Sequence, residues 1–227
     1  MLSISTSFGQ YYDTEFGKNR IQYKKFNWLF YTTSHFDVYY YDEGGKYAKE
    51  AIDYLEDEFN RLTDVLGYAP SAKTKIVIYN SYNDLQQSNI GIDGSVFTIG
   101  GEMEFIKLQL EIANPGTIQV FKEELIYLLS RTLINDMLYG GSLKEVFQSS
   151  HLLKLPEWFI DGAARYLAYG WDLKMDDFIR DYLDAKHIKK EKKIQGDQAG
   201  ALGQAIWNYI AIKYGASNIS NILNLTR

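Results

Sequence analysis

The spacing of hydrophobic residues divides this chain into a first half with strand patterns and a second half with helix patterns. Lys25–Tyr31 and His35–Tyr41 are runs of aromatic and β-branched residues on either side of a short polar turn. Such runs predict two strands, either as a hairpin or in succession. Thr74–Tyr79 is a compact apolar run, and Glu104–Ala113 alternates between apolar and polar residues. Both patterns predict strands, and we expect the strands to form a mixed sheet.

Helical spacing begins between these strands and dominates the second half. Apolar residues recur every three or four positions from Ala48 to Leu66, which predicts a long amphipathic helix that ends at Gly67. A second long helix is predicted from about Thr117 to Tyr139. Further helices are predicted over 81–88, 142–149, 156–170, 174–187, 199–214 and 217–225. The glycines in residues 89–101 predict a loop.

These elements predict an α+β fold, with a mixed β-sheet and helices in the N-terminal half and a mainly helical C-terminal lobe. Residues 1–24 show no sustained period, which predicts an N-terminal arm. The chain has 227 residues, enough to bury a substantial core. Residues 25–227 are therefore predicted to form a single domain, with an α/β lobe over about 25–140 and a helical lobe over about 141–227.

Composition excludes several classes of function. The net charge of -5 argues against nucleic acid as a partner, because phosphate binding requires a coherent basic surface. The chain has one cluster of basic residues, which we interpret as a solvated loop or helix end: Lys186, Lys189, Lys190, Lys192 and Lys193. The chain has no cysteine, so disulfides and thiol chemistry are excluded. No apolar run approaches the roughly 20 residues of a membrane span, so none is expected in this chain.

The candidate chemistry lies on the predicted helix from Thr117 to Tyr139. A thermolysin-type zinc site needs His-Glu-x-x-His on one helix, because residues four apart share a face and the intervening glutamate acts as general base. Here the corresponding frame is Glu123-Glu124-x-x-Tyr127. The carboxylate at the base position is kept, and both imidazole positions carry oxygen side chains.

A second motif follows on the next predicted helix. Leu155-Pro156-Glu157-Trp158-Phe159-Ile160-Asp161-Gly162-Ala163-Ala164 resembles the downstream motif of the gluzincins, which are peptidase-MA-like domains of the thermolysin type. The resemblance implies a zincin-like fold. It also places Asp161 at the position of the third zinc ligand, a glutamate in the family.

The residues in these positions argue against zinc, and we expect no bound metal and no cofactor. A catalytic zinc ion is typically held by three protein ligands, with neutral imidazole prominent among them. Glu123, Tyr127 and Asp161 offer instead two carboxylates and a phenol, and a phenol with an ordinary pKa of about 10 is a poor ligand at neutral pH. The histidines stand outside the motif at His35, His151 and His187. A weakly held calcium or magnesium ion on the carboxylates is the alternative.

Without a metal ion, Glu123, Glu124 and Asp161 would crowd negative charge into one place. Two cations are spaced to relieve it. Arg165 follows Asp161 by four residues on the same predicted helix face, and Arg131 lies two turns beyond Glu124. We expect one guanidinium, or solvent, to take the place of the ion.

The favoured hypothesis is a catalytically inactive peptidase-like domain that binds a protein or peptide or acts as a scaffold. One alternative is an active hydrolase with a non-standard metal or carboxylate site. Another is a carbohydrate-binding module that uses Trp28, Tyr39, Tyr41 or Trp171. A purely structural spacer is the third alternative.

The chain also resembles the N-terminal domain of exported Bacteroidetes proteins that continue into a Tol-type β-propeller. This resemblance implies a periplasmic or otherwise exported protein and a β-propeller of the same chain as a partner. The abrupt end at Arg227, in the middle of a hydrophobic pattern, fits a fragment of that kind.

Overall fold

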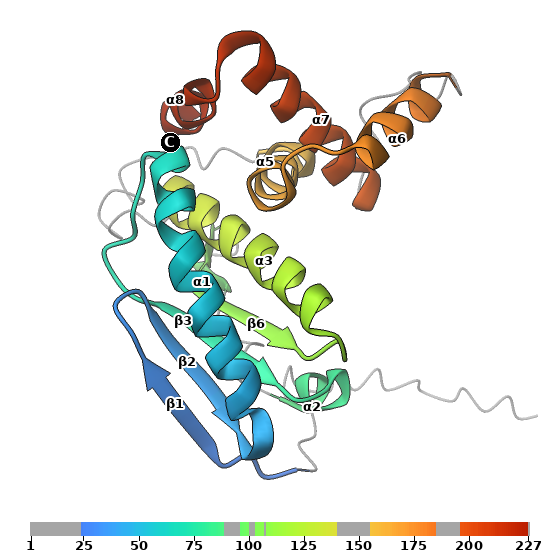
Figure 1. Cartoon of the computed structure of the whole chain (residues 1–227). Coiled ribbons are helices and arrows are strands. Elements are labelled where there is room, and N and C mark those ends of the chain that lie inside the picture. The colour runs from blue at the N-terminus through green and yellow to red at the C-terminus, as the bar shows by residue number, and fades with distance from the viewer. Residues whose placement is uncertain are drawn as a thin grey trace, which may run out of the picture.

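A computed structural model describes residues 24–88, 96–99, 103–106, 108–139, 155–184 and 196–226. The described chain is a mixed α+β structure, as the sequence predicts (Figure 1). Three predictions lie outside these residues, namely the arm before Lys24, the helix over 142–149 and the lysine cluster over 186–193.

The main sheet has four strands in the order β1-β2-β3-β6. Their bounds are β1 Trp28–Thr32, β2 Phe36–Tyr41, β3 Thr74–Tyr79 and β6 Gln109–Ala113. β1 pairs antiparallel with β2, whereas β2–β3 and β3–β6 are parallel. The parallel pairs require crossovers. One crossover is helix α1, Gly45–Leu66, which connects β2 to β3.

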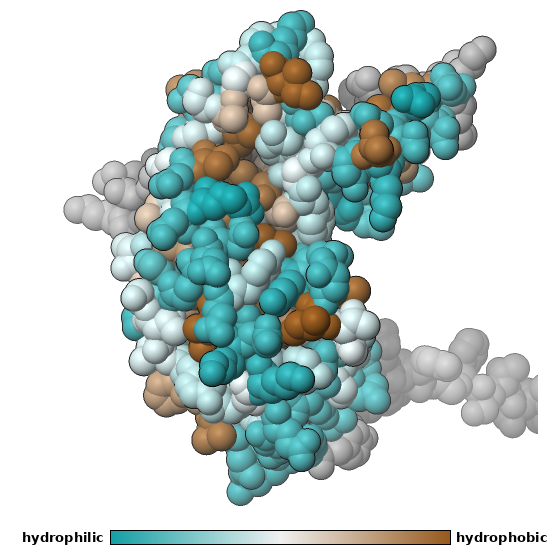
Figure 2. Space-filling view, in the orientation of Figure 1, coloured by the Kyte–Doolittle hydropathy of each residue, from teal (hydrophilic) through white to brown (hydrophobic). Residues whose placement is uncertain are grey.

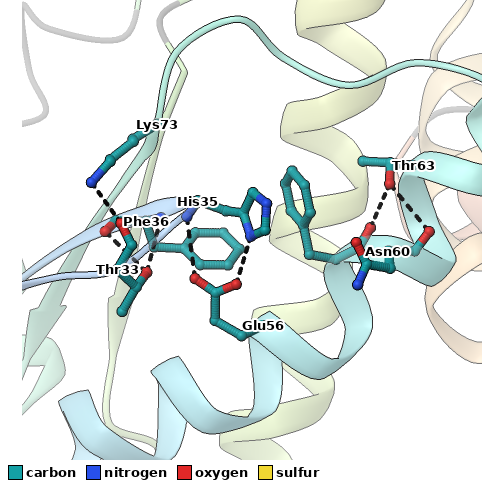
Figure 3. Close-up of polar contacts among 8 residues, drawn as sticks. Thr33, His35, Phe36, Glu56, Asn60, Thr63 and Lys73 are labelled. Atoms are coloured by element: carbon teal, nitrogen blue, oxygen red, sulfur yellow. Dashed lines mark hydrogen bonds and ion pairs between the residues drawn. The ribbon is translucent and has the colours of Figure 1, made fainter.

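The first two strands form a hairpin, which is one of the two arrangements that the sequence predicts. The backbone N–H of Thr33 donates to the carbonyl of Phe36 at 2.9 Å and closes the turn. Glu56 of α1 then accepts bonds from both the backbone N–H of His35, at 3.2 Å, and its ring Nδ1, at 2.6 Å (Figure 3). The turn is thereby fixed to α1, and the His35 ring stacks on Phe59 of the same helix at 3.9 Å.

Two long helices cover one face of the sheet (Figure 1). They are α1 and α3, Ile118–Tyr139, and their predicted extents are confirmed to within three residues. The core between them and the sheet includes Val38, Leu55, Ile76 and Leu125, all fully buried. α1 ends where Gly67 adopts a left-handed conformation, with φ of 61°, as its glycine predicts.

The opposite face of the sheet carries a second, aromatic cluster of Phe26, Tyr41, Val77 and Tyr79 with the nearby Trp28. The short helix α2, Tyr82–Gln87, packs beside it and is capped by Ser81, whose hydroxyl accepts from the N–H of Asp84 at 3.2 Å. Serine is a typical residue at a helix N-cap.

The sequence prediction is wrong between residues 96 and 113. The predicted strand Glu104–Ala113 is two strands, β5 Met103–Ile106 and β6, and β5 pairs with β4, Val96–Ile99, in a separate sheet. β4 itself lies within the predicted loop. The alternation of apolar and polar residues indicates which face of a sheet each side chain occupies. It does not indicate which strand the backbone pairs with.

Four described helices follow α3: α5 Glu157–Tyr169, α6 Leu173–Asp184, α7 Asp197–Tyr214 and α8 Ser217–Thr226. α5 and α7 cross closely at Gly162 and Gly203, because a Cβ on either glycine would overlap backbone atoms of the other helix. At the same crossing the indole N–H of Trp207 donates to the carbonyl of Phe159 at 2.9 Å. Among the described helices, none combines the length and the hydrophobicity that a membrane-spanning helix needs.

Candidate functional site

The two motifs singled out in the sequence meet where α5 packs on α3. Tyr127 and Arg131 lie one turn apart on α3, and Asp161 faces them from α5. This grouping arises because residues four apart share one side of a helix and that side is the one that α5 covers.

Arg131 is the cation that pairs with Asp161. Its Nε lies 3.1 Å from Oδ1 of Asp161, whose side chain is only 13% exposed, while the Arg131 side chain is 49% exposed. A carboxylate buried to this extent requires a partner, since an uncompensated charge in the interior is costly. The guanidinium supplies the compensation at the position that the resemblance assigns to a zinc ligand.

Tyr127 lies beside the ion pair. Partial burial raises the pKa of Tyr127, the charge of Asp161 raises it further, and a hydrogen bond to that carboxylate acts in the same direction. Arg131 and Arg165 oppose this rise without cancelling it. The phenol is therefore a protonated hydrogen-bond donor at neutral pH.

Arg165, the other candidate cation, does not pair with Asp161. It reaches across to α7 and forms an ion pair with Asp197, and its Cζ lies 5.9 Å from the centre of the Tyr127 ring. Asp197 could not be expected in this role from the sequence, because a contact between two helices so far apart in the chain leaves no local pattern.

Tyr169 also belongs to this site and was not among the candidate residues. Its ring stacks on Tyr127 with centres 6.2 Å apart and an interplanar angle of 16°. Partial burial raises the pKa of Tyr169 to about 12, and the nearby Glu123 and Glu124 contribute to the rise. Its position eight residues after Asp161, on the same side of α5, is the signal that would have identified it.

The two glutamates differ in their surroundings. Glu123 is exposed and accepts a hydrogen bond from Gln119 at 2.7 Å. Glu124 is half-buried, and burial raises its pKa. Within the described chain it has no hydrogen bond or ion pair.

These residues do not fit a zinc ion. Glu123 is exposed and bonded to Gln119, Tyr127 is a protonated phenol, and Asp161 is occupied by Arg131. Zinc instead requires deprotonated ligands in tetrahedral geometry. No group of three or more acidic, histidine or cysteine side chains suited to a metal ion occurs among the residues that the structure describes.

The aromatic candidates separate into three places. Tyr41 is fully buried, donates to Asp84 at 2.6 Å and accepts from the N–H of Asn80 at 2.8 Å, so it offers no surface to a ligand. Trp171 lies at the start of the α6 region and donates to Asp176.

Trp28 and Tyr39 share a groove of about 320 Å³ on the sheet face opposite α1 and α3. Lys75, Val77 and Gln109 complete its lining. The sequence could not bring these residues together, because they come from four strands whose order and register are set only by the fold.

No protein-family model matches this chain, and comparisons with curated proteins and with solved structures give no significant match.

Proposed function

We propose that this chain is a zincin-like, catalytically inactive peptidase-like domain that binds a protein or peptide. The observation that carries the proposal is the ion pair between Arg131 and Asp161. It stands where the resemblance to gluzincins implies metal coordination.

The chemistry of these side chains supports inactivity. Zinc-dependent hydrolysis requires ligands that hold the ion and a base that takes a proton from its bound water. Asp161 is already neutralised by a guanidinium, and Tyr127 holds its proton. Glu124 at the base position therefore has no metal-bound water to deprotonate.

The same surface has features that suit a peptide with basic side chains. Glu124 is half-buried and without a described partner, Glu123 is exposed beside it, and the Tyr169 side chain is 46% exposed. A lysine or arginine of a partner would neutralise Glu124 and contact the aromatic ring.

Inactivity is tested on protein purified without chelator. We expect metal content far below one ion per chain and no cleavage of casein or of a quenched fluorescent peptide library, with or without added zinc. Stoichiometric metal, together with hydrolysis that Glu124→Gln abolishes, would overturn the proposal in favour of an active hydrolase.

Binding is tested with an array of acidic, neutral and basic peptides. We expect basic peptides to be retained, and Glu124→Gln to weaken their binding about tenfold, as loss of one charged contact predicts. Asp57→Asn is the matched control, because Asp57 is an exposed carboxylate on α1. Equal binding of all peptide classes, or equal effects of both variants, would contradict this assignment.

A carbohydrate-binding function is the second candidate, and the groove between Trp28 and Tyr39 favours it. Aromatic rings beside amide and ammonium donors suit a sugar, which presents both apolar faces and hydroxyl groups. Glycan-array binding that is lost in Tyr39→Ala and kept in Tyr209→Ala would support it. Tyr209 is a suitable control because it is exposed on α7.

The resemblance also leads us to propose a setting for this domain, in an exported protein beside a β-propeller. Fractionation of the native cells with an antibody against this domain tests the location. Detection only in the cytosolic fraction would refute it.

A further inference from the structure

The outer edge of β1 presents a row of backbone groups that no described strand pairs with. β1 ends the strand order β1-β2-β3-β6, and no strand in the described chain pairs with its outer side. Leu29, Phe30 and Tyr31 are 52%, 61% and 44% exposed. Hydrophobic groups are visible in Figure 2 along the lower left of the molecule, where Figure 1 places β1.

The hairpin register shows which backbone groups point outward. Thr33 is hydrogen-bonded to Phe36 across the turn, and bonded pairs alternate along an antiparallel ladder. Tyr31 and Leu29 are therefore bonded to β2. Trp28, Phe30 and Thr32 direct their N–H and C=O groups to the open side.

Within the residues that the structure describes, this edge lacks the usual protection against pairing. Edge strands are commonly blocked by charged side chains, proline or a bulge. Trp28–Thr32 contains no charged residue, proline or glycine, and all five of its residues pair with β2 without a bulge. The edge is thus suited to accept another strand.

We propose that β1 pairs with β1 of a second copy of this chain, antiparallel about a two-fold axis at Phe30. This register sets Phe30 opposite Phe30 of the second copy. It sets Trp28 opposite Thr32, so that all the outward N–H and C=O groups of both strands are bonded.

The side chains favour a second copy as the occupant. Leu29 of one copy meets Tyr31 of the other, so each exposed apolar side chain is covered by another.

Light scattering after size exclusion, over a concentration series, tests the dimer. We expect a concentration-dependent dimer that Phe30→Lys abolishes, because two ammonium groups would meet at the axis. Leu225→Lys is the control and should leave the dimer intact, since Leu225 is 88% exposed on α8. An equimolar mixture of Phe30→Lys and Phe30→Glu should restore it. A monomer at every concentration, or a dimer that Phe30→Lys leaves unchanged, would overturn the proposal.

Cysteine cross-linking tests the register, and the chain contains no natural cysteine to interfere. Phe30→Cys should form a disulfide-linked dimer under mild oxidation, because a bonded antiparallel pair has Cα atoms about 5.5 Å apart. Leu29→Cys alone should form no such dimer, but a mixture of Leu29→Cys and Tyr31→Cys should form a disulfide-linked dimer. Equal cross-linking of Phe30→Cys and Leu29→Cys would contradict this register. If the edge binds a strand of another protein and the chain does not self-associate, the second copy is not the occupant.

Discussion

Nε of Arg131 on α3 lies 3.1 Å from Oδ1 of Asp161 on α5, and this pair connects the two helices that carry the candidate motifs. Asp161 is nearly buried and Arg131 is half exposed, so loss of the pair would affect the free energy of the two side chains differently. Solvent screens the guanidinium, whereas the carboxylate depends on it for neutralisation.

The first prediction concerns this pair. Arg131→Ala should lower the free energy of unfolding by about 1 to 2 kcal/mol, because it leaves the Asp161 carboxylate without its cation. Asp161→Asn should cost less, and the double variant should show a coupling of about 0.5 to 1 kcal/mol in urea denaturation. Arg180→Ala, which removes an exposed pair with Asp177, is the control, with an effect below about 0.5 kcal/mol. Additive effects of Arg131 and Asp161 would contradict the coupling.

The second prediction concerns the crossing of α5 and α7. Gly203→Ala should destabilise the protein by about 2 to 3 kcal/mol, because the added methyl group would meet the Trp158 carbonyl and force the helices apart. Gly200→Ala is the matched control on the same helix. Its methyl group would meet the flexible Arg165 side chain, which is able to shift, so we expect a smaller loss in thermal denaturation. Equal losses would mean that the close crossing does not limit the packing.

The third prediction is a pH dependence at Glu56. Partial burial acts to raise the pKa of Glu56, but hydrogen bonds from Thr33 and from the ring and N–H of His35 outweigh it, so the pKa lies below its ordinary value. A carboxylate with a lowered pKa in the folded state stabilises the protein above the unfolded pKa of about 4.5, and this contribution is lost as the pH falls through the folded pKa.

Glu56→Gln should therefore cost about 1 kcal/mol at pH 7, and the difference from the wild type should shrink as the pH falls below about 4.5. Urea denaturation of both proteins from pH 7 to below about pH 4.5 measures this difference in the free energy of unfolding. Asp57→Asn, with the neighbouring exposed carboxylate, should show no such trend. A difference that stays constant with pH would show that the charge of Glu56 is not responsible.

The fourth prediction tests whether the positions of the helical motif have the geometry of a metal site. A variant with Glu123→His, Tyr127→His and Arg131→Ala should acquire zinc-dependent thermal stabilisation, because two imidazoles four residues apart would face a freed Asp161. The wild type and the Arg131→Ala variant should show none. If zinc leaves the triple variant unchanged, Asp161 is not placed as a third ligand.

Much of the local structure follows directly from the sequence. α1 and α3 are long runs with helical spacing bounded by glycine, β3 is a short apolar run between turns, and Ser81 is a typical N-cap. These features depend on backbone propensities and on residues close together in the chain. They are therefore visible without a tertiary structure.

The pairing of the strands could not be predicted from the sequence. Glu104–Ala113 alternates throughout, yet the backbone leaves one sheet and enters another within that range. The same limit applies to the candidate site. Two arginines had suitable spacing, and only the packing of α7 decided that Arg165 would pair with Asp197 and leave Asp161 to Arg131.

The sequence by itself determined that imidazole is missing from both positions of the helical motif and that acidic and phenolic groups replace it. The tertiary structure decided which charges meet, which tyrosines stack and which strand edge is left without a partner among the described strands. The physical reason is that residue identity fixes the chemistry a position offers, whereas burial and partner distance, which set its energy, arise only when distant segments pack.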